Sequence, residues 1–206
     1  MGIMNFVKGG FACYVGVFLS GCASNDMTRS GFINNYNKLA PTQYENVLMY
    51  RASGFEAQNY ANIKVKDAVL KVKPESTQGL DKTAEQEILA YITMELRRQV
   101  GTPSPEPGAS GNLQMRVALT ELETPNRAVN WMTTLAMGPV TTGGASLELE
   151  VIEERTGRSV MAASCFDRGN VLTDFLSSYS QLGHAKVAVK SCIEKIDSVW
   201  RGVPLK

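Results

Sequence analysis

The start of the chain constrains most strongly what the rest can fold into. Residues 1–21 hold no acidic residue and one cation, Lys8, which precedes an apolar run of about 11 residues from Gly9 to Leu19. This run is much shorter than the roughly 20 apolar residues that a helix needs to span a bilayer. A short positive region, an apolar stretch and then small residues are typical of a secretory signal that is removed from the mature protein. We therefore expect the fold to be built by the residues that follow.

The end of this leader resembles a bacterial lipobox, with the order Leu19-Ser20-Gly21-Cys22. In a lipobox the signal peptidase recognises the residues before the cysteine, here Leu19, Ser20 and Gly21, and the cysteine thiol carries a diacylglycerol. We therefore expect cleavage before Cys22 and lipidation of its thiol. The alternatives are an ordinary secreted protein that is cut nearby and a buried apolar helix. Ala23, where enterobacterial lipoproteins of the inner membrane often carry Asp, favours export to the outer membrane.

Removal of 21 residues from the 206 of the chain leaves 185 in the mature protein. Residues 22–31 are small and polar and are expected to form a lipidated tether, followed by one α+β domain over residues 32–206. The net charge of the chain is only +1. We therefore expect the lipid to hold the protein at the membrane, and no nucleic acid among its partners. The single His leaves little material for a metal site, and the sequence predicts neither a metal nor a cofactor.

Alternation of apolar and polar side chains predicts four strands. They are expected over residues 62–73, 113–120, 146–151 and 159–166. The alternation slips at Asp67-Ala68, which suggests a bulge, and Pro74 ends the first strand. Residues 155–158 predict the turn of a hairpin that joins the last two strands.

Apolar residues at helical spacing predict two helices, over residues 81–100 and 182–200. Thr83 and Gln86 fit a capping box at the start of the first helix. The resulting order β-α-β-β-β-α predicts an α+β fold, in which two amphipathic helices pack on one face of a mixed four-stranded sheet. Its first two strands are expected to be parallel, because a helix connects them. Residues 32–60 are expected to form turns that pack aromatic side chains, with a brief helix over residues 42–49.

Several short motifs in the mature chain are similar to those of one known family. They are Ser30-Gly31-Phe32, Tyr36, Leu39, Tyr50-Arg51, Tyr60, Gly143-Gly144-Ala145, Glu148-Leu149-Glu150, Glu153 and Thr156-Gly157. Together they resemble a family of bacterial lipoproteins known as domain of unknown function 3313, whose members usually carry Asp where Glu153 stands. The resemblance implies a place in the cell envelope and supports the fold. It brings no established activity.

Cys165 and Cys192 remain once Cys22 is lipidated and Cys13 leaves with the signal. In an oxidising periplasm they can form a disulfide, and the alternative is a pair of buried thiols. Apolar residues occur on both faces of the strand that holds Cys165, so its orientation stays open.

The acidic hairpin and the only histidine are the candidates for catalysis. Glu148 and Glu150 point to the same face and could serve a hydrolase or hold a cation. The simpler interpretation, which we favour, is a sheet face exposed to solvent. His184 could act as a general base, but a partly exposed helix histidine is the better interpretation, since no Gly-x-Ser-x-Gly motif accompanies it.

The segment between Glu123 and Gly144 is long and apolar for a loop. It contains Trp131, Met132, Leu135 and Met137 and could dock a partner or touch lipid. The alternative is a flap that folds back over the sheet.

These observations favour a non-catalytic envelope lipoprotein that holds an unidentified protein partner or supports the envelope. A periplasmic hydrolase that uses Glu148, Glu150 or His184 is the second hypothesis. A binder of a small ligand or glycan through Tyr36, Tyr50 and Tyr60 is the third, and it requires a concave aromatic pocket.

Overall fold

The computed structural model describes residues 29–72, 81–100, 107–123, 144–168 and 182–202. In this part of the chain a seven-stranded sheet has the order β1-β2-β7-β6-β5-β3, with β4 also paired to β5. The strands are β1 (Ala40–Pro41), β2 (Val47–Arg51), β3 (Asn62–Val65), β4 (Val69–Leu70), β5 (Asn112–Glu123), β6 (Gly144–Glu153) and β7 (Ser159–Arg168). The helices are α1 (Lys82–Val100) and α3 (Gly183–Arg201), and two short 3-10 turns are η1 (Tyr36–Lys38) and η2 (Ala57–Asn59).

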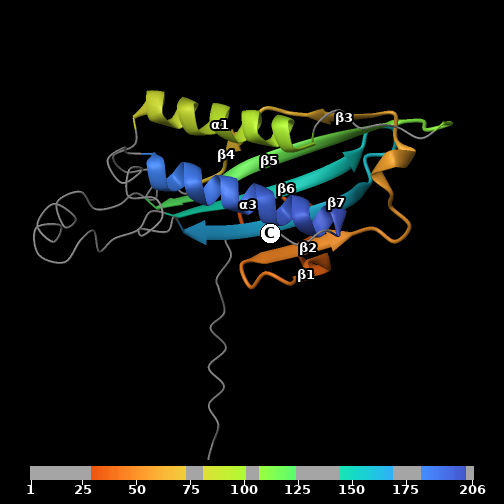
Figure 1. Cartoon of the computed structure of the whole chain (residues 1–206), viewed down its shortest axis with the longest axis horizontal. Helices are drawn as coiled ribbons and strands as arrows, with labels where there is room; N and C mark the ends of the chain where they lie inside the picture. The colour runs from red at the N-terminus through yellow and green to blue at the C-terminus, as the bar shows by residue number, and fades with distance from the viewer. Residues whose placement is uncertain (1–28, 73–80, 101–106, 124–143, 169–181, 203–206) are drawn as a thin grey trace, which may run out of the picture.

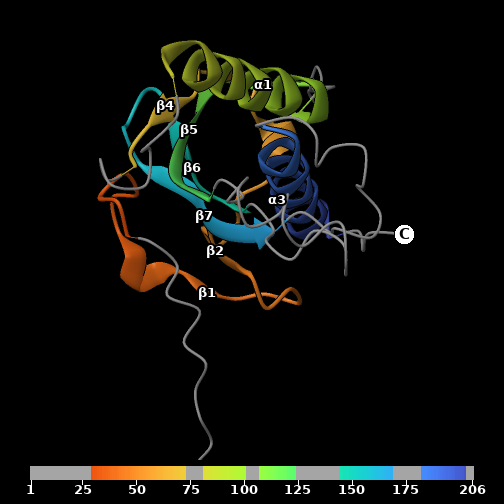
Figure 2. The same cartoon turned by 90° about the vertical axis from the view of Figure 1, so that its left-hand side faces the viewer.

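Both helices cover the same face of the sheet (Figures 1 and 2). Strands β5, β6 and β7 form an antiparallel meander at the centre of the sheet. Strands β3 and β4 run parallel to β5, as predicted from the helix that connects them. The α+β class and the mixed sheet are therefore confirmed.

The core lies between the helices and the sheet because each element has one apolar side. Alternate residues of β6 face the helices, among them Leu147, Leu149 and Val151, and are buried. Residues three or four apart on each helix meet them, including Ile88, Ile92 and Leu96 on α1 and Val189, Cys192 and Ile196 on α3. The patterns that predicted these elements are therefore the ones that build the core.

The prediction of four strands was wrong, because residues 40–51 extend the sheet. Strand β2 pairs antiparallel with β7, and β1 pairs with β2 at the edge. The brief helix expected over residues 42–49 is thus replaced by a turn and by β2. Val47 and Met49 bury their side chains in the core, and this burial outweighs the weak helical spacing of the segment.

The first predicted strand is split into β3 and β4, and the expected bulge lies between them. Val65 pairs with Met115 and Val69 pairs with Ala118, so residues 66–68 oppose only two residues of β5. Within this bulge, the Ala68 amide donates a hydrogen bond of 2.9 Å to the Thr93 hydroxyl of α1 instead of to strand β5.

The start of α1 differs from the predicted capping box, because Asp81 is the cap. Its Oδ1 accepts a hydrogen bond of 2.7 Å from the Ala84 amide.

Candidate functional site

The face of the sheet opposite the helices carries a row of polar side chains in register. Arg116 on β5 pairs with Glu150 on β6, and Glu150 pairs with Ala162 on β7. We call this side the open face, because neither helix covers it. Residues 29–39, which we call the N-terminal segment, pass over the open face, on the far side of the sheet from the helices (Figure 2).

Glu148 fastens the N-terminal segment to the open face. Its Oε2 accepts hydrogen bonds from the Ser30 hydroxyl at 2.7 Å and from the Tyr36 hydroxyl at 2.6 Å. Its Oε1 accepts a hydrogen bond of 3.1 Å from the Ser30 amide. The Glu148 residue is 0% exposed, so the expectation of a solvated acidic face was wrong at this position. The carboxylate is buried because neighbouring donors replace water.

Tyr36 organises the segment around this carboxylate. Its hydroxyl oxygen accepts the Gly31 amide at 2.9 Å and the Ile33 amide at 3.3 Å. Gly31 has a φ of +80°, a left-handed conformation that favours glycine. Burial, and then the hydrogen bond to the Glu148 carboxylate, raise the pKa of Tyr36 above its ordinary value. The phenol therefore stays protonated and keeps donating at physiological pH.

Glu150 is also buried, at 0% exposed, and its partner is Arg116. The guanidinium of Arg116 donates to Glu150 Oε2 through Nε at 3.1 Å and also through Nη2. The same Nη2 reaches the Phe32 carbonyl at 3.2 Å, and the guanidinium lies 4.9 Å from the centre of the Phe32 ring. Arg116 thus links the sheet to the N-terminal segment by a hydrogen bond and by a cation–π contact, both with Phe32.

We call Ser30, Phe32, Tyr36, Arg116, Glu148 and Glu150 the N-terminal clamp. Ser30 and Gly31, which the sequence alone assigned to the end of the tether, are thus hydrogen-bonded to Glu148 and Tyr36 of the folded domain.

Among the described residues, Glu150 Oε1 has no hydrogen-bond partner. A small cavity of about 160 Å³ lies on the β7 side of Glu150 and is also lined by Lys38 and Arg158. Of the two carboxylates considered for catalysis, Glu148 binds the N-terminal segment directly, and Glu150 pairs with Arg116, which reaches that segment.

His184 lies far from this pair, in the first turn of α3 on the opposite side of the sheet. It is 1% exposed, so the expectation of a partly exposed histidine was wrong. Neither ring nitrogen has a hydrogen-bond partner within the described ranges. The structure therefore does not bring His184 together with Glu148 and Glu150.

Cys165 and Cys192 form a disulfide that ties β7 to α3, with their Cα atoms 5.8 Å apart. Both residues are completely buried in the core. Cys165 therefore uses the helix-facing side of its strand, the point that the sequence left open.

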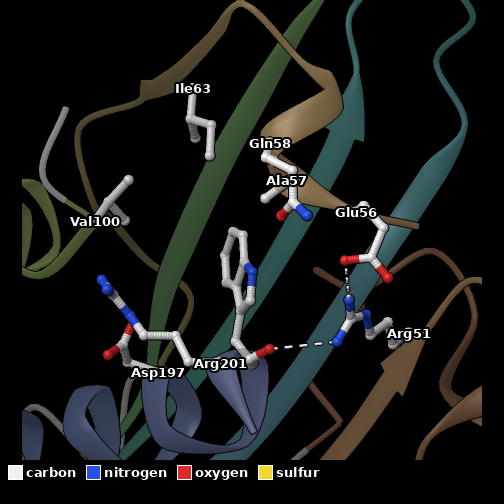
Figure 3. A pocket seen from close by; sticks show the side chains of 9 residues that line it. Arg51, Glu56, Ala57, Gln58, Ile63, Val100, Asp197 and Arg201 are labelled. Atoms are coloured by element: carbon white, nitrogen blue, oxygen red, sulfur yellow. Dashed lines mark hydrogen bonds and ion pairs between the residues drawn. The ribbon is translucent and has the colours of Figure 1, made fainter. Parts of the chain in front are cut away.

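A larger cavity, of about 510 Å³, lies where the C-terminal ends of both helices meet β2, η2 and β3. We call it the Trp200 pocket. It is lined by Arg51, Glu56, Ala57, Gln58, Ile63, Val100, Asp197, Trp200 and Arg201. Figure 3 shows Arg51 and Glu56 on one side of the pocket and Asp197 and Arg201 on another.

The three tyrosines proposed as a glycan site do not share one pocket. Tyr36 belongs to the clamp, and the ring of Tyr50 lies under the Lys38 ammonium at 4.9 Å. Tyr60 packs on Phe55 at 5.8 Å between ring centres, and Phe55 lies 6.2 Å from Trp200. Sequence reasoning missed the pocket because Trp200 fits the apolar stripe of α3. The nearby Tyr60 was the only signal for it.

Several predicted site residues lie outside the described part of the chain. They are Leu19, Ser20, Gly21 and Cys22 of the lipobox, and Trp131, Met132, Leu135 and Met137 of the apolar loop. Within the described residues, no helix is long and apolar enough to cross a membrane. The same residues contain no cluster of three or more His, Cys, Asp or Glu side chains suited to a metal ion.

The chain is similar to several solved structures, all at low identity and low TM-score. The PelC dodecamer from Paraburkholderia phytofirmans is 14% identical, with a TM-score of 0.42 over 73% of this chain and 94% of that chain. Lipoprotein GNA1162 from Neisseria meningitidis is 14% identical, with a TM-score of 0.29 over 66% of this chain and 97% of that one. The hypothetical protein CT253 from Chlamydia trachomatis is 10% identical, with a TM-score of 0.34 over 69% of this chain and 95% of that chain. At these scores the likenesses carry no inference about function.

No curated protein matches the chain at a significant level. The model of one family, described as protein of unknown function (DUF3313), matches residues 28–196. The match begins just before the N-terminal clamp and runs through most of α3, so it covers the whole sheet. The chain therefore belongs to the DUF3313 family.

Proposed function

We propose that this protein is an envelope lipoprotein held at the periplasmic face of the outer membrane by a lipid on Cys22. Its domain serves as a non-catalytic binding or structural module. The leader, with its lipobox, supports the anchor. The main observation in favour of a non-catalytic role is the burial of Glu148 and Glu150 beneath the N-terminal segment. Carboxylates that are shut off from water and already engaged by Ser30, Tyr36 and Arg116 are poorly placed for acid–base chemistry on a substrate.

The N-terminal clamp gives the anchor a mechanical connection to the fold. Seven residues lie between Cys22 and Ser30, and the eight residue steps from Cys22 to Ser30 span at most about 29 Å. The clamp fixes Ser30 on the open face, so the tether joins the body on the side away from the helices. In this proposal the open face lies nearest the bilayer, and the helices face the periplasm.

Fractionation of cells that express Cys22→Ser tests the anchor. The wild type is expected to incorporate labelled palmitate and to stay with outer membranes after a high-salt wash. Cys22→Ser should lose the label and should either accumulate unprocessed or leave the washed membranes. Cys13→Ser, which changes a cysteine of the leader, is the matched control and should behave as the wild type. A Cys22→Ser protein that is processed normally and remains on washed membranes would contradict the proposal.

We also place the contact with an envelope protein partner at the segment that holds Trp131, Met132, Leu135 and Met137. Its apolar composition is typical of the buried centre of an interface. A photo-crosslinking amino acid at position 131 or 135 should capture one discrete partner in intact cells, whereas the same probe at the exposed Glu87 should not. The same adduct pattern from all three positions would contradict this assignment.

A further inference from the structure

We propose that the Trp200 pocket binds a neutral glycan, with one sugar ring stacked on the indole and its hydroxyls held by the surrounding polar side chains. The proposal names the ligand class of the binding role proposed above and rests on that role. The pocket lies at the end of the helical layer, whereas the clamp, which begins at Ser30, lies on the open face. A ligand in the periplasm can therefore reach the pocket in the anchored protein.

The pocket has the size and the construction of a ligand site. Its volume of about 510 Å³ lies within the range of about 300–1,000 Å³ that is common for small-molecule pockets. Its walls come from separate elements, with Ala57 from η2, Ile63 from β3 and Val100 from the last turn of α1. Because each of these elements is packed against the core, the cavity is formed by the fold itself.

The aromatic side of the pocket is Trp200, whose ring is held by packing against Phe55. Trp200 is half-buried at the end of α3, and the buried Phe55 ring lies 6.2 Å from it at a tilt of 56°. Tyr60 supports Phe55 from its other side. An indole that is held in one orientation with part of its surface open offers a flat apolar platform. The C–H face of a pyranose ring matches such a platform, because polarised C–H groups meet the negative face of the π system.

The polar wall is balanced in charge. Arg51 pairs with Glu56 at 3.2 Å, and Arg201 pairs with Asp197 at 2.8 Å, so two cations face two acids. Figure 3 shows the Arg51–Glu56 pair across the pocket from Arg201 and Asp197. An anionic ligand would meet the carboxylates, and a cationic ligand would meet the guanidinium groups. The pocket therefore favours a neutral ligand that can both donate and accept hydrogen bonds.

These polar groups are held in place before any ligand arrives. Arg51 donates to the Phe55 carbonyl through Nη2 at 2.8 Å and to the Trp200 carbonyl through Nη1 at 3.3 Å. Arg201 donates to the Gln99 carbonyl at 2.7 Å. The Gln99 amide donates to Asp197 Oδ2 at 3.0 Å. Fixed planar groups lose little conformational entropy when they bind neighbouring hydroxyls, which is the arrangement that a glycan requires.

Binding is measured on the full-length lipidated protein, extracted in lauryldimethylamine oxide, a detergent without a sugar headgroup. The probes are N,N′,N″-triacetylchitotriose and maltotriose. Saturation-transfer NMR reports contact with the sugar protons. Fluorescence in a Trp131→Phe background reports on Trp200 alone, because these are the two tryptophans of the chain. We expect at least one probe to bind with a dissociation constant of about 1 mM or below.

Trp200→Ala should weaken this binding about tenfold or more, and Gln58→Ala, a change at an exposed side chain, should weaken it several-fold. Glu154→Gln, a change at an exposed side chain that does not line the pocket, is the control and should bind as the background does. Three results would overturn the proposal: no saturation transfer with either probe at about 10 mM, unchanged binding in both pocket variants, or binding of polygalacturonate in place of both neutral probes. Membrane fractionation tests the anchor separately, so a failure to bind glycan leaves that result standing.

Discussion

Tyr36 and Glu148 are 112 residues apart in the sequence, yet the Tyr36 hydroxyl donates a hydrogen bond of 2.6 Å to Glu148 Oε2. The same hydroxyl oxygen accepts the amides of Gly31 and Ile33. The phenol therefore connects a buried carboxylate of the central strand to the backbone of the N-terminal segment. Glu148 therefore helps to hold the N-terminal segment on the sheet, and the strength of its interaction with Tyr36 can be measured.

A double-mutant cycle measures the strength of this connection. We expect Glu148→Gln to lower the free energy of unfolding by about 1.5–3 kcal/mol, because it weakens hydrogen bonds to a charged acceptor. Tyr36→Phe should cost about 1–2 kcal/mol. The two losses should not add, and a coupling of about 1 kcal/mol is expected for a direct contact. Urea unfolding gives the values, with Glu154→Gln as an exposed control. Strictly additive losses would mean that Tyr36 and Glu148 do not interact.

The raised pKa of Tyr36 predicts a loss of stability at alkaline pH. A pKa that is higher in the folded state favours the protonated phenol, so its contribution is fully present below the unfolded pKa of about 10. The contribution is lost as the pH rises through the folded pKa, where an ionised Tyr36 would repel the Glu148 carboxylate. Unfolding free energies measured from pH 8 to pH 11.5 should fall more steeply in the wild type than in Tyr36→Phe. Parallel curves would show that this phenol does not titrate differently in the folded state.

Gly31 should resist substitution, although the space beside it has room for a larger residue. No heavy atom lies within 4 Å of a Cβ built at this position. The loss of stability on substitution therefore comes only from the left-handed backbone, with its φ of +80°. Gly31→Ala should destabilise the protein by about 1–2 kcal/mol. Gly31→Asn should cost less, since Asn tolerates the left-handed region better than Ala. Thermal unfolding of both variants checks the order, and equal stability of Gly31→Ala and wild type would refute a left-handed backbone at Gly31.

The disulfide between Cys165 and Cys192 should contribute strongly to stability. It closes a loop with a sequence separation of 27. On a chain-entropy estimate, a loop of that size contributes about 3.5 kcal/mol. Intact mass under non-reducing conditions should be about 2 Da below that of the reduced protein, since each disulfide replaces two thiol hydrogens, and reduction should lower the unfolding midpoint. Two thiols that react with an alkylating agent in the unfolded, unreduced protein would show that the bond is absent.

Elements with a regular pattern were predictable from the sequence. The helices α1 and α3 and the strands β5, β6 and β7 each direct one apolar side into the core between the helices and the sheet, so their apolar residues recur with the period of the element. Strand β2 carried no such signal. Val47, Leu48, Met49 and Tyr50 are all apolar or aromatic, because one side of β2 packs in the core and the other is half-buried. A short run without alternation does not distinguish a strand from a turn of helix.

The clamp was only half predictable. Alternation correctly placed Glu148 and Glu150 on one face, but it does not tell what covers that face. The covering segment, with Ser30 and Tyr36, has no periodicity of its own and is held by a few long-range hydrogen bonds. Burial of His184 was missed for a related reason. A position beside the apolar stripe of a helix can still be covered by other parts of the chain.

Amide hydrogen exchange of residues 30–33 tests the central claim most directly, namely that the open-face carboxylates serve to fasten the N-terminal segment. The amides of Ser30, Gly31 and Ile33 donate to Glu148 or Tyr36. We expect all three to be protected in the wild type and to exchange about tenfold or more faster in Glu148→Gln, whereas Glu154→Gln should leave them unchanged. Rapid exchange of these amides in the wild type, or equal protection in Glu148→Gln, would contradict the account.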